Sequence, residues 1–291
     1  EYIGFMGCDD EIDPNCLLEL AKAIEKNPHV EFLYSDFDKI DERDRRFAPS
    51  FWPDWSPHLI TSQMYTAHVT CYKRDVLQKL GSLREGTDGA QDWDLVLRYW
   101  TEYYRDWKVV HIPKVLYHWR ITEGSTAKSG RKAKSWAYER QKDILEDYLM
   151  RRNIKGGVIE GLYDGSWRVR YEIKNNPKIS IVIPFKDKVE LLKKALPSIL
   201  EKTKYGNYEI VLIDNQSKDE KTAKYIKEIT KDSRVKVIKY DNPYHFGKMY
   251  NWAIEQISSD YVLMLNNDVE IISEGWLTSM LELAQLPEVG L

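Results

Sequence analysis

The chain has 291 residues, of which 43% are hydrophobic and 31% are charged, and its formal net charge is −3. Such a composition is typical of a globular protein with one large domain or two ordinary ones. Basic and acidic residues are nearly balanced, so we expect no nucleic-acid partner. The three cysteines, Cys8, Cys16 and Cys71, form no CxxC pair, which favours a reducing cytoplasmic compartment over a disulfide scaffold.

Residues 1–129 are expected to mix strands with helices. In chain order, the apolar spacing predicts a strand at Tyr2–Met6, a helix near Pro14–Lys26, a strand at Glu31–Asp36, an aromatic loop at Phe47–Pro57, a strand at Tyr65–Tyr72, a helix near Arg74–Leu80, a helix that opens at Asp92 and a strand at Val109–Trp119. We interpret this segment as one predicted domain portion.

Residues 130–177 have the pattern of a structured connector. A charged amphipathic helix is predicted over Lys132–Arg152. Asp164-Gly165 then predicts a hairpin turn, and alternating apolar residues follow it from Trp167 to Ile173.

Residues 178–291 alternate strand and helix, which predicts an α/β fold with a mainly parallel sheet. The predicted elements are, in chain order, a strand at Ile179–Phe185, a helix at Val189–Leu200, a strand at Tyr208–Ile213, a helix at Glu220–Thr230, a strand at Val235–Tyr240, a helix at Phe246–Ile257 and a strand at Tyr261–Leu265. Ligands of such sheets bind at the carboxyl ends of the strands. Asp187, Asp214 and Asp268 each follow a predicted strand end.

One short pattern occurs twice, as EYIGFMGCDDE in Glu1–Glu11 and as DYVLMLNNDVE in Asp260–Glu270. The repeat aligns Asp9 with Asp268 and predicts an apolar strand, an acidic corner and a helix in each copy. Such a corner can supply oxygen ligands to a divalent cation on a diphosphate. A helix cap or an Asx turn is the alternative for each acidic side chain.

Two further residues have both a chemical and a structural interpretation. Asp92, in GAQDWD, can act as a general base on a sugar hydroxyl or can cap the helix that follows it. His118, in YHWR, can be a metal ligand or a buried structural side chain. The common nucleotide and hydrolase signatures GxxxxGKS, HExxH, GxSxG and GxGxxG are absent from the sequence.

These motifs together resemble the inverting family 2 glycosyltransferases of the GT-A fold, in particular bacterial proteins with tandem copies of that domain. ISIVIPFKDK, YEIVLIDNQSKD and YVLMLNNDVEII are similar to its nucleotide-binding half, whereas YSDFDKID, GAQDWDLVLR, HIPKVLYHWR and GSTA are similar to its acceptor-binding half. The resemblance implies two partial copies joined by a helix and a hairpin: residues 1–129 as the catalytic half of one domain and residues 178–291 as the nucleotide half of the next.

The resemblance also implies roles for residues 178–291. Asp187 and Asp214 would hold the nucleoside, and Asn251, Asn266 and Asp268 would contribute to the nucleotide-sugar site. Asp268 would in addition bind Mg²⁺ or Mn²⁺ with the diphosphate.

In residues 1–129, Asp92 would be the catalytic base, and Asp9 and His118 would bind the metal. Gly7 and Asn266 stand where the first acid of the family's metal motif is expected. The partners implied are a nucleotide-sugar donor, such as a UDP-sugar, and a glycan acceptor.

The function implied is transfer of a sugar to a glycan with inversion in cell-surface polysaccharide synthesis, in the cytoplasm or peripherally at the inner face of the membrane beside its assembly machinery. A nucleotidyltransferase is one alternative, although the Gly-rich phosphate loop that it needs is absent after Ile179–Phe185. A degenerate, non-catalytic carbohydrate-binding or scaffold module is the other. We further expect the two halves, each incomplete, to associate with one another or between chains and the isolated chain to be poorly stable.

Overall fold

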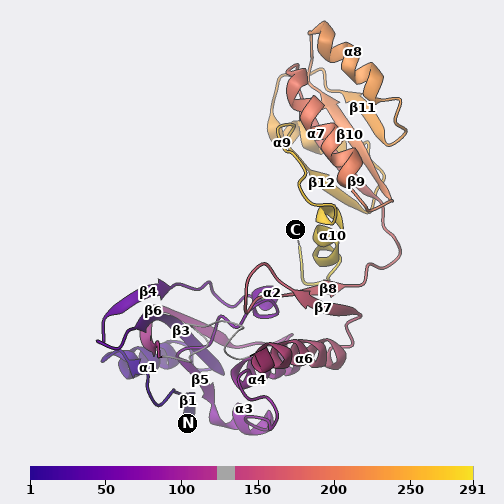
Figure 1. Ribbon diagram of the computed structural model, residues 1–291. Helices are drawn as coiled ribbons and strands as arrows, with labels where there is room; N and C mark the ends of the chain where they lie inside the picture. The colour runs from indigo at the N-terminus through magenta and orange to yellow at the C-terminus, as the bar shows by residue number, and fades with distance from the viewer. Residues whose placement is uncertain (123–134, 291) are drawn as a thin grey trace. The chain divides into compact units, whose positions relative to one another are not determined.

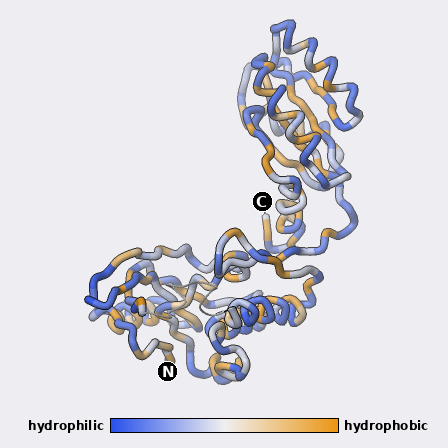
Figure 2. The backbone as a smooth tube through the Cα atoms, in the orientation of Figure 1, coloured by the Kyte–Doolittle hydropathy of each residue, from blue (hydrophilic) through white to orange (hydrophobic). Residues whose placement is uncertain are grey.

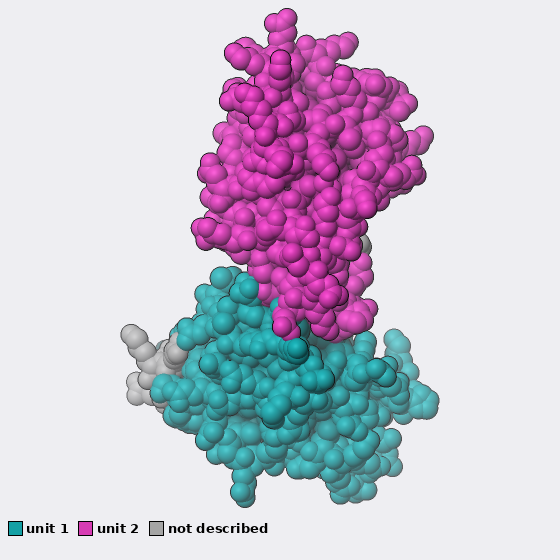
Figure 3. Space-filling model, turned by 90° about the vertical axis from the view of Figure 1, so that its right-hand side faces the viewer, with its two compact units in different colours: residues 1–171 teal, residues 172–291 magenta. Residues whose placement is uncertain are grey.

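The structure is a computed structural model that describes residues 1–122 and 135–290. The chain divides into two compact units, residues 1–171 and residues 172–291, which Figure 3 colours separately. The helix and hairpin that were predicted to be a connector therefore belong to unit 1. The GSTA motif at residues 124–127 lies outside the described residues.

Unit 2 alternates strands and helices, as its sequence predicts. Its elements are β9 (Ile179–Phe185), α7 (Val189–Lys202), β10 (Tyr208–Asp214), α8 (Glu220–Ile229), β11 (Val235–Lys239), α9 (Phe246–Ile254), β12 (Tyr261–Met264) and α10 (Trp276–Ala284). All four strands are parallel, in the order β11-β10-β9-β12. The predicted α/β fold with a parallel sheet is confirmed for this unit (Figure 1).

Helices cover both faces of this sheet. Successive side chains of each strand point to opposite sides, so each strand contributes to a hydrophobic cluster on either face. Ile181 and Leu212 pack with residues of α7 and α10 in one hydrophobic cluster. Val182 and Val211 pack with residues of α9 in the other. Figure 2 shows α8 as a largely hydrophilic helix, in keeping with its sequence EKTAKYIKEI. The chain reverses its direction of progress across the sheet at β9, which is where α/β sheets bind ligands.

Unit 1 is built on a mixed sheet. Its elements are β1 (Tyr2–Phe5), β2 (Glu11–Ile12), α1 (Cys16–Lys26), β3 (Phe32–Ile40), β4 (Arg46–Ser50), α2 (Pro57–Ile60), β5 (Thr70–Lys73), α3 (Arg74–Lys79), α4 (Gln91–Tyr103), β6 (Val109–Arg120), α6 (Ser135–Arg151), β7 (Gly156–Glu160) and β8 (Trp167–Tyr171). The strand order is β1-β5-β3-β6-β2, and β4 also pairs with β3. The central strands β3 and β6 are parallel to each other.

The predicted helix and hairpin of the connector are present, as α6 and as the β7–β8 pair. They are part of the core of unit 1 because α6 packs against α4. The indole N–H of Trp100 on α4 donates to the hydroxyl of Tyr148 on α6 at 2.9 Å. The backbone N–H of Trp167 on β8 donates to the carbonyl of Ser62 at 2.7 Å.

One predicted strand of unit 1 is much shorter than expected. The sequence predicts Tyr65–Tyr72, but pairing starts only at Thr70. The edge of β3 beyond Tyr34 is taken by β4, which pairs with β3 from Phe37 onward. β4 includes the first residues of Phe47–Pro57, the segment that was predicted to be an aromatic loop. The hydroxyl oxygen of Ser35 accepts from the N–H of Val69 at 3.2 Å, at the position where backbone pairing between β3 and β5 would otherwise continue.

The internal repeat corresponds to the same local structure in both units. The offset of 259 residues between Tyr2 and Tyr261 maps the bounds of β1 onto those of β12. A helix follows in each case, α1 and α10. Within the described part of the chain, no helix combines the length and the apolar character that crossing a membrane requires.

Glu209 on β10 carries a buried charge in unit 2. Its carboxylate accepts from Ser180 Oγ at 2.7 Å and pairs with the Nζ atoms of Lys178 at 2.8 Å and Lys236 at 2.7 Å. Burial alone would raise the pKa of Glu209, but these hydrogen bonds outweigh burial and lower the pKa from 4.5 to about 2.

We predict that Glu209→Gln lowers the free energy of unfolding of unit 2 by about 1–3 kcal/mol at pH 7, because two lysines lose their partner. The folded-state pKa lies below the value of the free side chain, so the stabilisation is complete above pH 4.5 and is lost as the pH falls toward 2. Denaturant unfolding between pH 3 and 7 measures this loss. The control is Glu228→Gln on the exposed side of α8, and a difference between Glu209→Gln and wild type that does not shrink with falling pH would contradict the prediction.

Candidate functional site

Asp187 and Asp214 meet at the carboxyl ends of the central strands of unit 2. Asp187 Oδ1 accepts from the backbone N–H groups of Lys218 at 2.7 Å and Asp219 at 2.8 Å. Asp214 Oδ1 accepts from the N–H of Ser217 at 2.9 Å, and Ser217 Oγ accepts from the N–H of Asp187 at 2.9 Å. Both predicted nucleoside-binding carboxylates therefore hold the same loop, between β10 and α8, and each has a second oxygen free of these bonds.

The backbone at this edge is shaped by residues in the left-handed region. Asp187 and Lys188 both have φ of 51°, which is uncommon for residues other than glycine and is typical of functional corners. Asn215, the residue after Asp214, is buried, and its side-chain N–H groups donate to the carbonyls of Tyr240 at 3.2 Å and Asn242 at 2.9 Å. The ends of β9, β10 and β11 are thus tied into one rigid rim.

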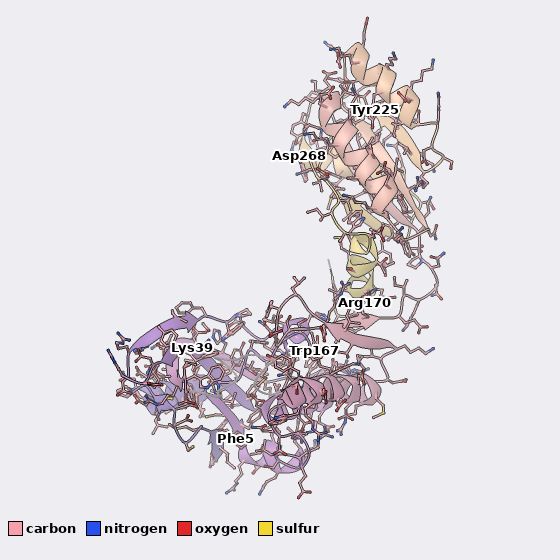
Figure 4. The ribbon with its side chains drawn as sticks, in the orientation of Figure 1. Phe5, Lys39, Trp167, Arg170, Tyr225 and Asp268 are labelled. Carbon is pink, nitrogen blue, oxygen red and sulfur yellow. The ribbon has the colours of Figure 1, made fainter. Side chains whose placement is uncertain are left out.

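The remaining predicted residues of unit 2 lie at exposed positions on neighbouring elements. Asn266 and Asp268 follow the edge strand β12, and Asn251 lies on α9. Figure 4 labels Asp268, which extends from the end of β12. Neither Asp268 nor Asn266 makes a side-chain hydrogen bond or ion pair within the described ranges, so a capping role, the structural alternative, receives no support from a side-chain bond there.

In the acidic corner of unit 1, residues 7–10, the hydrogen bonds of the side chains are made by Asp10. The carboxylate of Asp10 accepts from the hydroxyl of Tyr117 and, at 2.8 Å, from the N–H of Arg120. A Cβ on Gly7 would lie 2.3 Å from Asp10 Oδ2. Gly7 therefore leaves room for the Asp10 side chain, whereas the carboxylate of Asp9 is exposed.

His118 lies in the same part of unit 1 and is buried. Its Nδ1 is 2.5 Å from Asp38 Oδ1, and Arg46 Nε donates to the other oxygen of Asp38 at 2.6 Å. The two residues face each other across β3 and β6, and Glu11 on β2 faces His118 from the other side. A carboxylate on one ring nitrogen fixes the orientation of the imidazole and leaves Nε2 for a ligand.

Asp92 is the second residue of α4. Its Oδ1 accepts from the N–H of Trp93 at 2.8 Å. Burial raises the pKa of the Asp92 carboxyl, and the backbone hydrogen bonds oppose that rise without cancelling it. A carboxylate with a raised pKa is a better general base near neutral pH. The local environment therefore fits the predicted catalytic role.

A buried charge network holds the start of α4 in place. Asp94 is 1% exposed and pairs with Arg84 and with Arg98, whose Nε is 2.8 Å from Asp94 Oδ2. Arg84 Nη2 also donates at 2.9 Å to Asp147 on α6, and Asp147 pairs with Arg151. This network lies two residues from Asp92 and couples it to a helix that sequence analysis had placed in the connector.

The structure thus places Asp187 and Asp214 against the same loop in unit 2. In unit 1 it places the backbone carbonyl of Asp9 at 2.7 Å from Nε of Arg120, two residues after His118 on β6. Among residues 1–122 and 135–290, no group of three or more His, Cys, Asp and Glu side chains is arranged to hold a metal ion. Sequence reasoning missed Asp38 and Asp94. Asp38 could have been found from the strand pattern, because it alternates with Asp36 in YSDFDKID.

Residues 180–290, nearly all of unit 2, match the family described as Glycosyl transferase family 2. This segment is therefore similar to the family 2 glycosyltransferases. The whole chain is 36% identical over 291 residues to the O-antigen biosynthesis protein RfbC of Myxococcus xanthus, of which it covers 22%. It is also 36% identical over 291 residues to the uncharacterized protein y4gI of Sinorhizobium fredii, of which it covers 32%. The chain therefore spans a third or less of these relatives.

Among solved structures, the chain is similar to the mannosyltransferase PcManGT of Pyrobaculum calidifontis, determined with GDP-Man and Mn²⁺, with 16% identity and a TM-score of 0.38 over 41% of this chain and 35% of that chain. It is similar to TarS of S. aureus with 23% identity and a TM-score of 0.33 over 37% of this chain and 32% of that chain.

We predict that Asp94→Asn destabilises unit 1 by about 3 kcal/mol, because it leaves the buried guanidinium of Arg98 without its charge partner. Denaturant unfolding followed by tryptophan fluorescence measures the change. Asp88→Asn, at an exposed position before α4, is the matched control and is expected to stay within about 0.5 kcal/mol of wild type. A loss below about 1 kcal/mol for Asp94→Asn would show that the network contributes little.

Proposed function

We propose that residues 178–291 bind a nucleotide-sugar donor and that the parent protein transfers the sugar to a glycan acceptor with inversion, in the synthesis of a cell-surface polysaccharide. The observation that carries the proposal is that Asp187 and Asp214, at the ends of two parallel strands, hold the same loop in a segment that matches the family 2 glycosyltransferases. Likeness to an O-antigen biosynthesis protein supports a polysaccharide product.

The donor site is argued from the free oxygens of this rim. Each carboxylate uses one oxygen to hold the β10–α8 loop, and its other oxygen can accept from a hydroxyl of the ribose or an N–H of the base. The rim includes the end of β9, the strand at which the order of the sheet turns toward β12, and such a turning point is the usual ligand position in an open α/β sheet.

The donor set also fits a Mg²⁺ or Mn²⁺ ion that arrives with the diphosphate. Magnesium is usually held by one or two carboxylates together with phosphate oxygens and water, so the absence of a three-residue cluster from the described ranges is compatible with binding. Asp268 would hold the ion in unit 2, with Asn266 beside it, and Asp9 with His118 in unit 1. The ion would neutralise charge on the departing diphosphate.

Asp92 is the residue that we propose for the chemical step. Its carboxylate takes the proton of the acceptor hydroxyl while that oxygen bonds to the anomeric carbon and the bond from this carbon to the diphosphate oxygen breaks. A single displacement of this kind inverts the configuration at the anomeric carbon. The raised pKa of Asp92 and its placement by the Asp94 network support the role.

We predict that Asp92→Asn in the intact parent protein lowers sugar transfer about 10²–10⁴-fold in the domain to which residues 1–129 contribute, because the acceptor hydroxyl loses its base. Donor binding is expected to be unchanged, since the general base makes little contact with the nucleotide. Turnover with saturating acceptor and calorimetric titration of donor measure the two effects. Normal turnover in the variant would remove Asp92 from the role.

We predict that Asp268→Ala weakens binding of UDP mainly when Mn²⁺ or Mg²⁺ is present, because a carboxylate that bridges a metal matters only with the metal. Calorimetric titration of this chain with UDP, with and without Mn²⁺, tests both the donor site and the metal role. Glu270→Ala, at the next exposed acidic position, is the control. Equal loss of affinity in both conditions would contradict coordination, and no UDP binding by the wild type would contradict the donor site.

A further inference from the structure

Three side chains form a row across the carboxyl end of the sheet of unit 1. Lys39 on β3 is paired in register with Phe47 on β4 and with Trp119 on β6. Directly paired residues on neighbouring strands point to the same face of a sheet. With strands about 4.8 Å apart, the row of Phe47, Lys39 and Trp119 spans about 10 Å. We call this row the aromatic platform.

The platform is accessible to solvent. Phe47 is 44% exposed, and Lys39 and Trp119 are half-buried. Trp119 is supported from within the unit by two rings: that of Phe37, with centroids 6.4 Å apart and planes at 67°, and that of His68, with centroids 5.4 Å apart. The Trp119 ring is therefore fixed in orientation before any ligand binds, which lowers the entropic cost of stacking on it.

Lys39 supplies a cation without a carboxylate partner. Its Nζ lies 5.8 Å from the centroid of the Trp119 ring. Across the ranges that the structure describes, it forms no ion pair. Lys79 of the same unit shows the contrast, because its Nζ is 5.1 Å from the ring of Tyr103 but also 3.3 Å from Glu102 Oε1. Lys39 is thus available to an anionic group that stacks on the platform.

The platform also lies next to the acidic corner of unit 1. Trp119 is between His118, which bonds to Asp38, and Arg120, whose backbone N–H bonds to Asp10. The side chains of Trp119 and His118 point to opposite faces of the sheet. A group on the platform is therefore near His118, a proposed metal ligand, but on the opposite face of the sheet. Figure 4 labels Lys39 at the part of unit 1 where β4 lies.

We propose that the aromatic platform binds an acidic pyranose unit of a glycan, such as a uronic acid. The apolar C–H face of the acidic sugar stacks on Trp119, its carboxylate pairs with the ammonium group of Lys39, and Phe47 contacts the next sugar of the glycan. This unit is remote from the reacting hydroxyl, so its binding holds the glycan at the enzyme through contacts that the chemistry does not use. The statement that this glycan is the acceptor rests on the proposed function, whereas the binding of an acidic sugar does not.

The experiment is titration of the ¹⁵N-labelled chain with tetragalacturonate, followed by the indole N–H signal of Trp119. We expect a saturable shift in the wild type and affinity that falls as salt rises. Lys39→Met is expected to weaken binding about threefold to fivefold, and Phe47→Ala by a similar factor. Lys79→Met is the matched control, since this lysine also lies over an aromatic ring, and it should bind as wild type does.

Maltotetraose, a neutral glycan of the same length, is expected to bind at least threefold more weakly. No saturable shift with tetragalacturonate, or unchanged affinity in folded Lys39→Met, would overturn the proposal. Equal affinity for both glycans would overturn its acidic specificity. UDP titration of the same samples reports separately on the donor site, so loss of glycan binding with UDP binding intact contradicts the platform and leaves the proposed function standing.

Discussion

The parallel pairing of β9 with β10 is the constraint on which the donor site depends. Its register places Asp214 opposite Phe185, so that Asp187 emerges two residues later beside the loop that follows Asp214. Both strands are buried on both faces, and a slip of one residue would exchange their two hydrophobic faces. The hydrophobic cores on the two sides of the sheet thereby fix the position of two carboxylates that contribute nothing to those cores.

The pairing of β3 with β6 has the same effect in unit 1, with a different result on each face. It sets Asp38 beside His118 on one face and Lys39 beside Trp119 on the other. The first pair is buried and joined by a hydrogen bond, whereas the second is partly exposed to solvent. Strand alternation thus separates an ionic pair suited to orienting a ligand from an aromatic surface suited to a sugar, using adjacent residues of the same two strands.

The sequence predicts unit 2 almost completely, because its strands are continuous apolar runs and its helices have clear periodicity. Unit 1 was harder. The shortened β5 follows from β4 occupying the same edge of β3, and no local pattern encodes that competition. Likewise, the sequence places Asp187 and Asp214 at the ends of strands, where the structure has them, but the contacts of Asp94 and Arg84 depend on α6 packing against α4. Such contacts between distant segments have no signature in a single sequence.

The internal repeat allows one strand of each sheet, β1 in unit 1 and β12 in unit 2, to be compared. β1 and β12 have matching bounds, yet β1 pairs with β5 antiparallel and β12 pairs with β9 in parallel. The same local pattern, an apolar strand that ends at an acidic corner, therefore stands in a different sheet context in each unit. That residues 1–129 and 178–291 are complementary halves of two related domains stays a prediction.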